Sequence, residues 1–253
     1  MKGKFLAVLA LAGVAGMSSA QESERDSARV AELSEVVVKV VSAPKGAPFA
    51  VSRISKKELQ EFSTSGQELP YLFARTPGVV AWSENGLGTG TVYMRMRGSA
   101  GSRVNVTIDG ISLNSPEDQC VFWANMNSYA SLLGSVQIQR GVGSSSNGDG
   151  AFGGSIAMQT RLPQMDPMLE VTGSYGSYNT WRAGGQFSTG LLGKHWVVDG
   201  AYHQTSTDGY LHGTHGKSGS YTAGVAWLSE DSRLVLKYRN LGNFESTGQA
   251  WNG

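Results

Sequence analysis

Five runs of alternating apolar and polar residues follow one another after Pro163. They begin near Leu169, Trp181, Trp196, Tyr221 and Leu234. A period of two predicts strands with one apolar and one polar face, and runs of about ten residues suit tilted strands that cross a membrane. Tight links at Gly193-Lys194 and 230–232 alternate with a long link over 207–219, as in a barrel with short turns at one end and long loops at the other. A water-soluble β-sandwich is the alternative for the same pattern.

The front of the chain alternates over shorter stretches, separated by helix-start signals. Ser55-Lys-Lys-Glu58 matches a capping box, and Ser65-Gly-Gln-Glu68 repeats it before a second helix that Pro77-Gly78 ends. Strands are predicted over 49–54, 79–82, 91–97 and 104–108. Asp109-Gly110 predicts a turn after the last of them. We therefore expect a small mixed α/β domain that ends near Thr160.

Residues 135–160 close this domain with two short alternating runs around a link rich in Gly and Ser. Because glycine allows close approach of backbones, the segment predicts a compact hairpin-like element packed against a neighbour. Gly148, Gly150 and Gly153 also spell the dinucleotide-binding pattern G-x-G-x-x-G. That pattern requires a following helix, and the residues after it are strand-like, so a nucleotide site is not expected.

Composition narrows the class of protein further. The 253 residues include 34 Gly and only 16% charged residues, which favours strands and turns over amphipathic helices. The formal net charge of +1 argues against a nucleic-acid partner. Met1 to Ala20 reads as a secretory signal, with an apolar core too short to span a bilayer as a helix. Cys120 is the single cysteine, so no internal disulfide is possible.

Two other segments bear on function. His212-Gly-Thr-His215 is weak evidence for a metal site, because no carboxylate or thiol lies nearby, and we expect no metal or cofactor. No G-x-S-x-G stretch supports an acyl-transfer enzyme. Residues 34–41 form a β-prone run after a polar segment. This run fits either a strand added to another protein's sheet edge or the first strand of the following domain.

Four motifs occur in order after the signal. They are Thr76-Pro-Gly-Val79, Met96-Arg-Gly98, Val106-Thr-Ile-Asp-Gly-Ile111, and the block from Gln139-Arg-Gly141 to Gly154-Ser-Ile-Ala-Met-Gln-Thr160. Together they resemble the N-terminal part of TonB-dependent outer-membrane receptors, in which a plug domain sits inside a 22-stranded barrel. The resemblance implies an α+β plug domain followed by antiparallel strands of an incomplete transmembrane β-barrel. Since five strands cannot close a barrel, we expect the front part of a longer protein.

The resemblance also implies a division of the chain and a coupling segment. We expect a signal peptide over 1–20, an N-terminal segment over 21–41, the plug over 42–162 and barrel strands over 163–253. The TonB box, which pairs with a periplasmic energy transducer, would comprise Glu35, Val36, Val37, Val38, Lys39 and Val40. This assignment favours the added-strand interpretation of that run.

Candidate site residues follow from the same resemblance. Ligand contacts are expected from the outward-facing plug loops 83–90, 99–103 and 112–128, through Trp82, Asn85, Arg103, Asn114, Phe122 and Trp123. For each of these, plug core or plug–barrel packing is the alternative role. Structural roles in the plug are expected for Arg97, Gly98, Asp109, Gly110, Arg140, Gly141, Gly153 and Gly154. The two arginines are expected to pair with barrel carboxylates.

The expected function is energy-dependent import of a scarce, bulky ligand across the outer membrane of a Gram-negative cell, without enzymatic activity. An iron chelate such as a siderophore or haem leads, with cobalamin and oligosaccharides as alternatives. Outer-membrane lipid would surround the strands. A passive barrel or surface ligand-binding protein that needs no transducer is the competing reading, and an exported β-protein with enzymatic loops is a weaker third.

Overall fold

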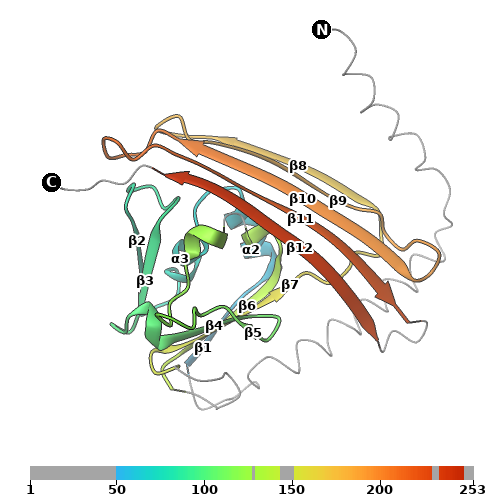
Figure 1. Cartoon of the computed structure of the whole chain (residues 1–253), viewed down its shortest axis with the longest axis horizontal. Helices are drawn as coiled ribbons and strands as arrows, with labels where there is room; N and C mark the ends of the chain where they lie inside the picture. The colour runs from blue at the N-terminus through green and yellow to red at the C-terminus, as the bar shows by residue number, and fades with distance from the viewer. Residues whose placement is uncertain (1–49, 127–128, 143–150, 230–233, 248–253) are drawn as a thin grey trace, which may run out of the picture.

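The computed structural model describes residues 50–126, 129–142, 151–229 and 234–247 (Figure 1). The predicted signal peptide and the predicted TonB box therefore lie outside the described residues. The described residues form two bodies. A mixed α/β unit is followed by a curved sheet, and the chain passes from one to the other after Thr160.

The first body is built on a five-stranded sheet in the order β1-β6-β7-β4-β5. Its strands are β1 (Ala50–Ile54), β6 (Leu133–Arg140), β7 (Gly154–Thr160), β4 (Val104–Ile108) and β5 (Ile111–Ser112). β4 and β7 run parallel, and the other neighbours are antiparallel. A separate hairpin joins β2 (Val79–Ser83) to β3 (Val92–Met96). The predicted strand positions are confirmed, and β6 and β7 form the hairpin-like element.

Short helices cover this sheet and complete one core. They are α2 (Lys56–Ser63), α3 (Leu69–Phe73), η2 (Gly101–Arg103), η3 (Trp123–Met126) and η4 (Tyr129–Ser131). Leu59, Phe62 and Phe73 from the helices are almost fully buried against Ile138 and Ile156 of the sheet. Burial of such side chains contributes roughly 1.5–3 kcal/mol each, so this core holds the unit together.

The first helix starts as predicted and the second does not. Ser55 and Glu58 form the full capping box of α2, with each side chain bonded to the other's backbone N–H. The second expected box is wrong, because the N-cap of α3 is Glu68 rather than Ser65. Pro70 occupies the first turn, where its missing N–H has no cost. The Glu68 side chain accepts from the Gly90 N–H and does not cap the helix.

Backbone conformation or close packing accounts for the glycine in three of the four motifs. Arg97-Gly98 and Asp109-Gly110 each form a two-residue turn in which both residues have positive φ, of 50° and 78° and of 49° and 83°. Gly154 has a φ of 146°, and a Cβ there would overlap the Gln139 carbonyl and the Met96 sulfur. Strand β7 begins at this glycine, so a strand follows the G-x-G-x-x-G pattern, as predicted.

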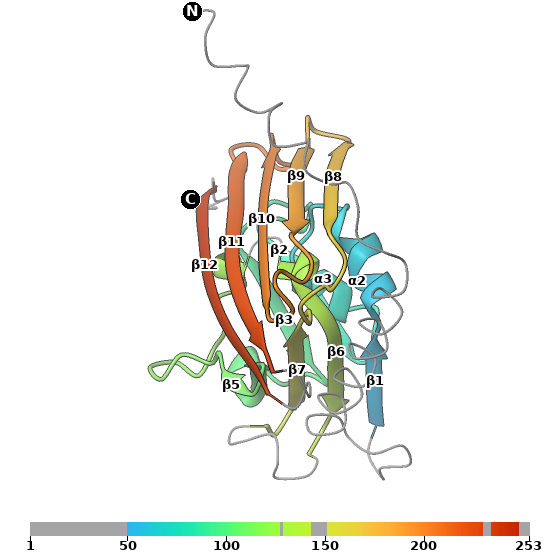
Figure 2. The same ribbon diagram turned by 90° about the vertical axis from the view of Figure 1, so that its right-hand side faces the viewer.

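The second body is a five-stranded antiparallel meander in the order β12-β11-β10-β9-β8 (Figure 2). Its strands are β8 (Met168–Tyr175), β9 (Trp181–Ser188), β10 (Trp196–Thr207), β11 (Gly216–Leu228) and β12 (Val235–Thr247). The long link spans 208–215, shorter than the predicted 207–219, because β10 and β11 continue pairing to Thr207 and Gly216. Polar threonines and serines at these ends conceal the strand continuation in the sequence.

The two faces of this sheet differ in chemistry. The face turned away from the first body carries the exposed side chains of Leu169, Val171, Tyr175, Trp181, Phe187, Trp196, Tyr202, Tyr221, Val225, Leu236 and Tyr238. The opposite face carries Arg182, Ser188, His203, Thr205, Ser218, Ser220 and Thr222, all buried. An apolar outer face over a polar inner face is the inverse of a water-soluble sandwich and matches an outer-membrane barrel wall.

The α/β unit lies against the concave, polar face of the curved sheet (Figure 1). Within the described residues the sheet is open, with β8 and β12 at its two edges. The fold is therefore an α+β plug beside antiparallel strands of an incomplete barrel, as predicted. In the part of the chain that the structure describes, none of the helices has the length and apolar character needed to cross a membrane.

Candidate functional site

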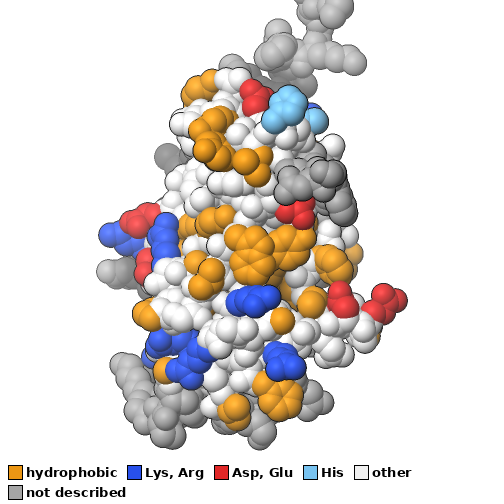
Figure 3. Space-filling model, turned by 90° about the vertical axis from the view of Figure 1, so that its left-hand side faces the viewer, with side chains coloured by type: hydrophobic (Ala, Val, Ile, Leu, Met, Phe, Trp, Pro, Cys, Tyr) orange, Lys and Arg blue, Asp and Glu red, His pale blue; other side chains and the backbone are white. Residues whose placement is uncertain are grey.

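A cavity of about 380 Å³ opens between the β2–β3 hairpin and the loop 118–124. We call it the aromatic cavity. It is lined by Trp82, Tyr93, Met94, Arg95, Val104, Val106, Asp118, Cys120, Phe122 and Trp123, among others. In Figure 3, which views the side of the molecule bearing this hairpin, hydrophobic side chains gather at the middle of the face with charged ones around them. The volume of the aromatic cavity falls within the range of small-molecule sites.

Two aromatic rings and a guanidinium form one wall of the aromatic cavity. Trp82 and Tyr93 are cross-strand neighbours on β2 and β3, and their rings stack with centroids 5.6 Å apart. The Arg95 guanidinium lies 6.0 Å from the Trp82 ring centroid. Tyr93 donates a hydrogen bond of 2.8 Å to the Glu84 carboxylate, and this bond raises the pKa of Tyr93. The wall thus offers an apolar π surface beside a fixed positive charge.

The opposite wall comes from the loop that leads into η3. Trp123 is buried and packs edge-on against Phe73 at 5.5 Å, which anchors the loop to the core. Phe122, its neighbour, remains 60% exposed. Burial, and secondarily the Asp118 carboxylate, raises the pKa of Cys120, so its thiol stays protonated at neutral pH. One anchored and one free aromatic side chain suit a wall that contacts a ligand.

The structure brings three of the six predicted ligand residues together. Trp82, Phe122 and Trp123 line the aromatic cavity. Asn85 is buried, and its side chain accepts from the Leu87 N–H at 2.9 Å and donates to Thr89 within its own loop. Asn85 also holds the loop to the second body, because its carbonyl accepts from the Tyr210 N–H at 3.1 Å.

Arg103 and Asn114 lie outside the aromatic cavity. Asn114 uses its amide group inside the plug, accepting from the Val106 N–H at 2.8 Å and donating to the Val104 carbonyl at 2.9 Å. The loop 99–103 follows the end of β3 opposite to the loop 83–90, since Val79 pairs with Met96 and Ser83 with Val92. Two of the three loops expected to face outward are therefore at opposite ends of one hairpin.

The arginines expected to pair with barrel carboxylates make other contacts. Arg140 donates to the Pro77 carbonyl at 3.1 Å, which joins the end of β6 to the turn before β2. Arg97 occupies the tight turn after β3, and its guanidinium lies over Gly141, where a Cβ would leave too little room. Both contacts lie within the plug, and among the described residues neither arginine forms an ion pair with a carboxylate of the sheet.

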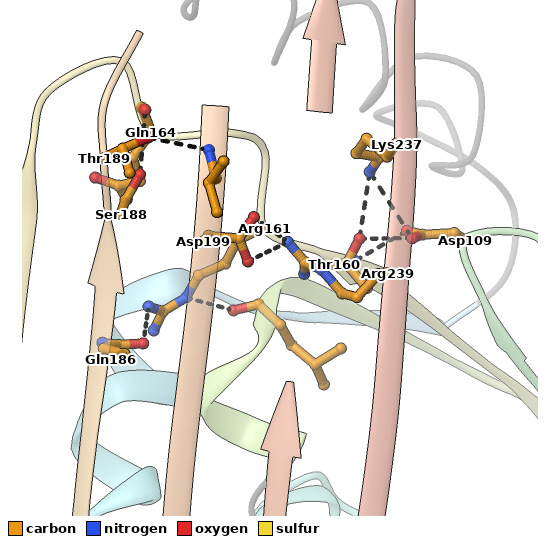
Figure 4. A network of polar contacts seen from close by, with 12 residues as sticks. Asp109, Thr160, Arg161, Gln164, Gln186, Ser188, Thr189, Asp199, Lys237 and Arg239 are labelled. Carbon is orange, nitrogen blue, oxygen red and sulfur yellow. Dashed lines mark hydrogen bonds and ion pairs between the residues drawn. The ribbon is translucent and has the colours of Figure 1, made fainter. Parts of the chain in front are cut away.

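Plug and sheet are joined by a network of polar contacts (Figure 4). Asp109 accepts from the Thr160 N–H at 2.9 Å, and Lys237 of β12 approaches both residues, at 3.9 Å and 3.3 Å. Arg161 donates to the Leu133 carbonyl at 3.3 Å and to Gln186 of β9 at 3.1 Å. Burial lowers the pKa of Arg161. The contacts concentrate where the plug chain passes into the sheet.

Several lining residues were missed at the level of sequence. Tyr93 and Arg95 occupy alternate positions of β3, and their exposure follows from the period of two once Val92, Met94 and Met96 are taken as core. The expected ligand contacts lie in loops or at the end of β2, so these two residues of β3 were not among them. Cys120 and Asp118 lie in the predicted loop 112–128, although neither was singled out within it. Among the described residues, no group of three or more His, Cys, Asp or Glu side chains is arranged to hold a metal ion.

One family model matches most of the first body. Residues 43–155 match the TonB-dependent receptor plug domain. No curated protein sequence matches the chain.

Solved structures show the same fold at low identity. Pseudomonas aeruginosa FpvA bound to heterologous pyoverdines is 16% identical with a TM-score of 0.59, covering 72% of this chain and 23% of that one. The copper transporter OprC is 14% identical with a TM-score of 0.64, covering 83% and 33%. The ferric yersiniabactin uptake receptor FyuA from Yersinia pestis is 14% identical with a TM-score of 0.57, covering 78% and 32%. The chain thus spans about a quarter to a third of their length.

The molecule is therefore a plug domain seated on the polar face of a barrel-type sheet. Residues 43–155 match the model of the TonB-dependent receptor plug domain, and the solved structures share the fold of most of the chain.

Proposed function

We propose that this protein imports a scarce, bulky ligand across the outer membrane, with energy delivered through the TonB box at residues 35–40 and the plug. The observation that carries the proposal is the plug itself, packed on the polar inner face of a sheet whose outer face is apolar. An apolar outer face supports insertion of the strands in outer-membrane lipid. A plug inside a barrel supports a transporter that must be opened.

We propose the aromatic cavity as the ligand-contacting surface of the plug. Stacked Trp82 and Tyr93 with Arg95 beside them favour a ligand with flat apolar or aromatic groups and negative charge. An iron chelate, such as a siderophore or haem, has this character. Receptors for pyoverdine and yersiniabactin chelates among the structural matches are consistent with that choice, and the copper transporter keeps other metal cargo open.

Uptake measurements test the proposal. Cells expressing the full-length protein should accumulate the radiolabelled ferric chelate, and cells that lack the periplasmic transducer should bind the chelate without accumulating it. Uptake that continues unchanged without the transducer would instead identify a passive barrel or surface-binding protein, and the energy-coupled proposal would fail.

A further inference from the structure

A buried carboxyl lies where the plug meets the barrel-type sheet, away from the aromatic cavity and from the network of Figure 4. Glu68, the N-cap residue of α3, is only 3% exposed. Its backbone N–H donates to the Gly88 carbonyl at 2.8 Å, and its carboxyl accepts from the Gly90 N–H. Glu68 therefore ties α3 to the loop 83–90, which also contacts Tyr210, in the link between β10 and β11, through Asn85.

The sheet faces this carboxyl with charged and polar groups from three strands. Arg182 of β9 and Glu245 of β12 are its charged neighbours. From β10, Thr205 accepts from the Arg182 guanidinium at 3.4 Å, and the plug residue Gly66 packs against the same threonine. His203 lies on that inner face two residues before Thr205 and is buried. The carboxyl is thus enclosed by both bodies.

The surroundings of Glu68 disfavour a negative charge. Its Oε2 atom is buried without a hydrogen-bond partner among the described residues. An ionised carboxylate oxygen deprived of both water and a donor is far more costly than a neutral one. Burial first, and the Glu245 carboxylate second, raise the pKa of Glu68 well above its usual value, although Arg182 and the Gly90 N–H act in the opposite direction.

We propose that Glu68 is a proton-carrying latch, whose carboxyl is protonated while the plug rests against the sheet and ionises when that contact opens. Opening transfers the carboxyl to water, where it loses its proton to solvent. The docked plug therefore binds one more proton than the opened plug over the interval between the two ionisations. Docking is strongest at low pH and weakens as the pH rises through the ionisation of docked Glu68.

This inference rests on the proposed function only for the idea that the plug moves. It is therefore tested without ligand or transducer, on the full-length protein in outer membranes. The reporter is a cysteine at the buried, inward-facing Ser220, placed in a Cys120→Ser background, and its rate of thiol labelling is measured between about pH 5 and pH 8. Each rate is divided by that of a cysteine at the exposed Val142, which corrects for the reactivity of the thiolate itself.

The normalised rate should rise about fivefold across this range in the protein with Glu68, which corresponds to about 1 kcal/mol. Glu68→Gln keeps the shape and the acceptor for Gly90, and it should hold the rate at its low-pH value throughout. Glu61→Gln, an exposed glutamate on α2, should keep the normal profile. A pH-independent rate in the parent protein, or an unchanged profile in Glu68→Gln, would overturn the latch.

A second variant tests the proposal independently, in case Glu68→Gln does not fold. Glu245→Gln removes the carboxylate that opposes ionisation of Glu68, so the midpoint of the labelling profile should move to lower pH. A midpoint that stays in place or moves upward would contradict the proposal. Ligand uptake is not measured in either variant, so failure of the latch leaves the import proposal standing, and failure of import leaves the latch standing.

Discussion

Two close contacts between neighbouring strands depend on single residues. Trp82 and Tyr93 stack across the β2–β3 hairpin because they are register partners, and Arg95 reaches the same ring. Gly184 is a second case, since a Cβ there would overlap the ring of His203 on the neighbouring strand. The first contact serves binding in our proposal, and the second serves only packing.

Trp82 gives a prediction about binding. Trp82→Ala removes the stacked surface of the aromatic cavity, so the affinity for the ferric chelate should fall about tenfold, or about 1.4 kcal/mol. Equilibrium binding to the full-length protein measures the change. Trp196→Ala removes an exposed tryptophan from the outer face of the sheet and should leave affinity unchanged. Equal affinities for parent protein and Trp82→Ala would remove Trp82 from the proposed site.

Gly184 gives a prediction about stability. Gly184→Ala forces the buried His203 ring to move, and such overpacking costs about 1–3 kcal/mol. Unfolding of the full-length protein in urea should show this loss. Gly173→Ala is the matched control on the adjacent strand, because its nearest neighbour would be a backbone oxygen 3.9 Å away. A stability loss as large in the control as in Gly184→Ala would rule out the ring clash as the cause.

Strands and turns are the scale at which the sequence is most informative. Alternation located all five strands of the sheet and both faces, and the capping box located α2. The Asp109-Gly110 pair located the turn after β4, because these residue types accept the positive φ that a two-residue turn requires. The turn at Arg97-Gly98 was not predicted, since the expected strand ran through Arg97. The second capping box failed because Glu68 is drawn into the contact with Gly90, a neighbour distant in sequence.

The apolar face of the strands leads to a prediction about membrane insertion. Val171 of β8 is 79% exposed on the outer face, so Val171→Arg should destabilise the protein folded in lipid vesicles by about 2–4 kcal/mol. Asn243→Arg changes a residue of β12 that pairs with the inward-facing Ser220, and it should cost far less. Similar costs at both positions would argue that the sheet does not face lipid.

The whole molecule is held together differently from its plug core. The core of the plug is apolar, whereas its contacts with the sheet include ion pairs and hydrogen bonds such as those of Lys237 and Arg161. Exposed or partly exposed ion pairs contribute little, about 0–1 kcal/mol each. A plug held by such contacts can separate from the sheet without unfolding its own core. This suits the plug movement that the proposed transport requires.

Coupling to the transducer is tested at this scale as well. Val37→Pro removes a backbone donor from the expected TonB box, so strand pairing with the transducer and energy-dependent uptake should both be lost. Binding of the ferric chelate should persist, which separates coupling from recognition. A peptide of residues 33–42 should capture the periplasmic domain of the transducer, and the same peptide with proline at position 37 should not. Capture by both peptides would count against strand pairing.

Sequence alone determined the local and periodic features of this protein. Period-two alternation, a capping box and glycine turns depend on residues close together in the chain, so the strands, α2 and the family motifs could be read directly. Tertiary structure alone decided which side chains meet. Trp82 and Phe122 line one cavity although they are 40 positions apart, Glu68 is enclosed by three distant strands, and Asn114 is used inside the plug. Such contacts depend on how segments far apart in the chain pack together, and a short stretch of sequence carries no information about its distant neighbours.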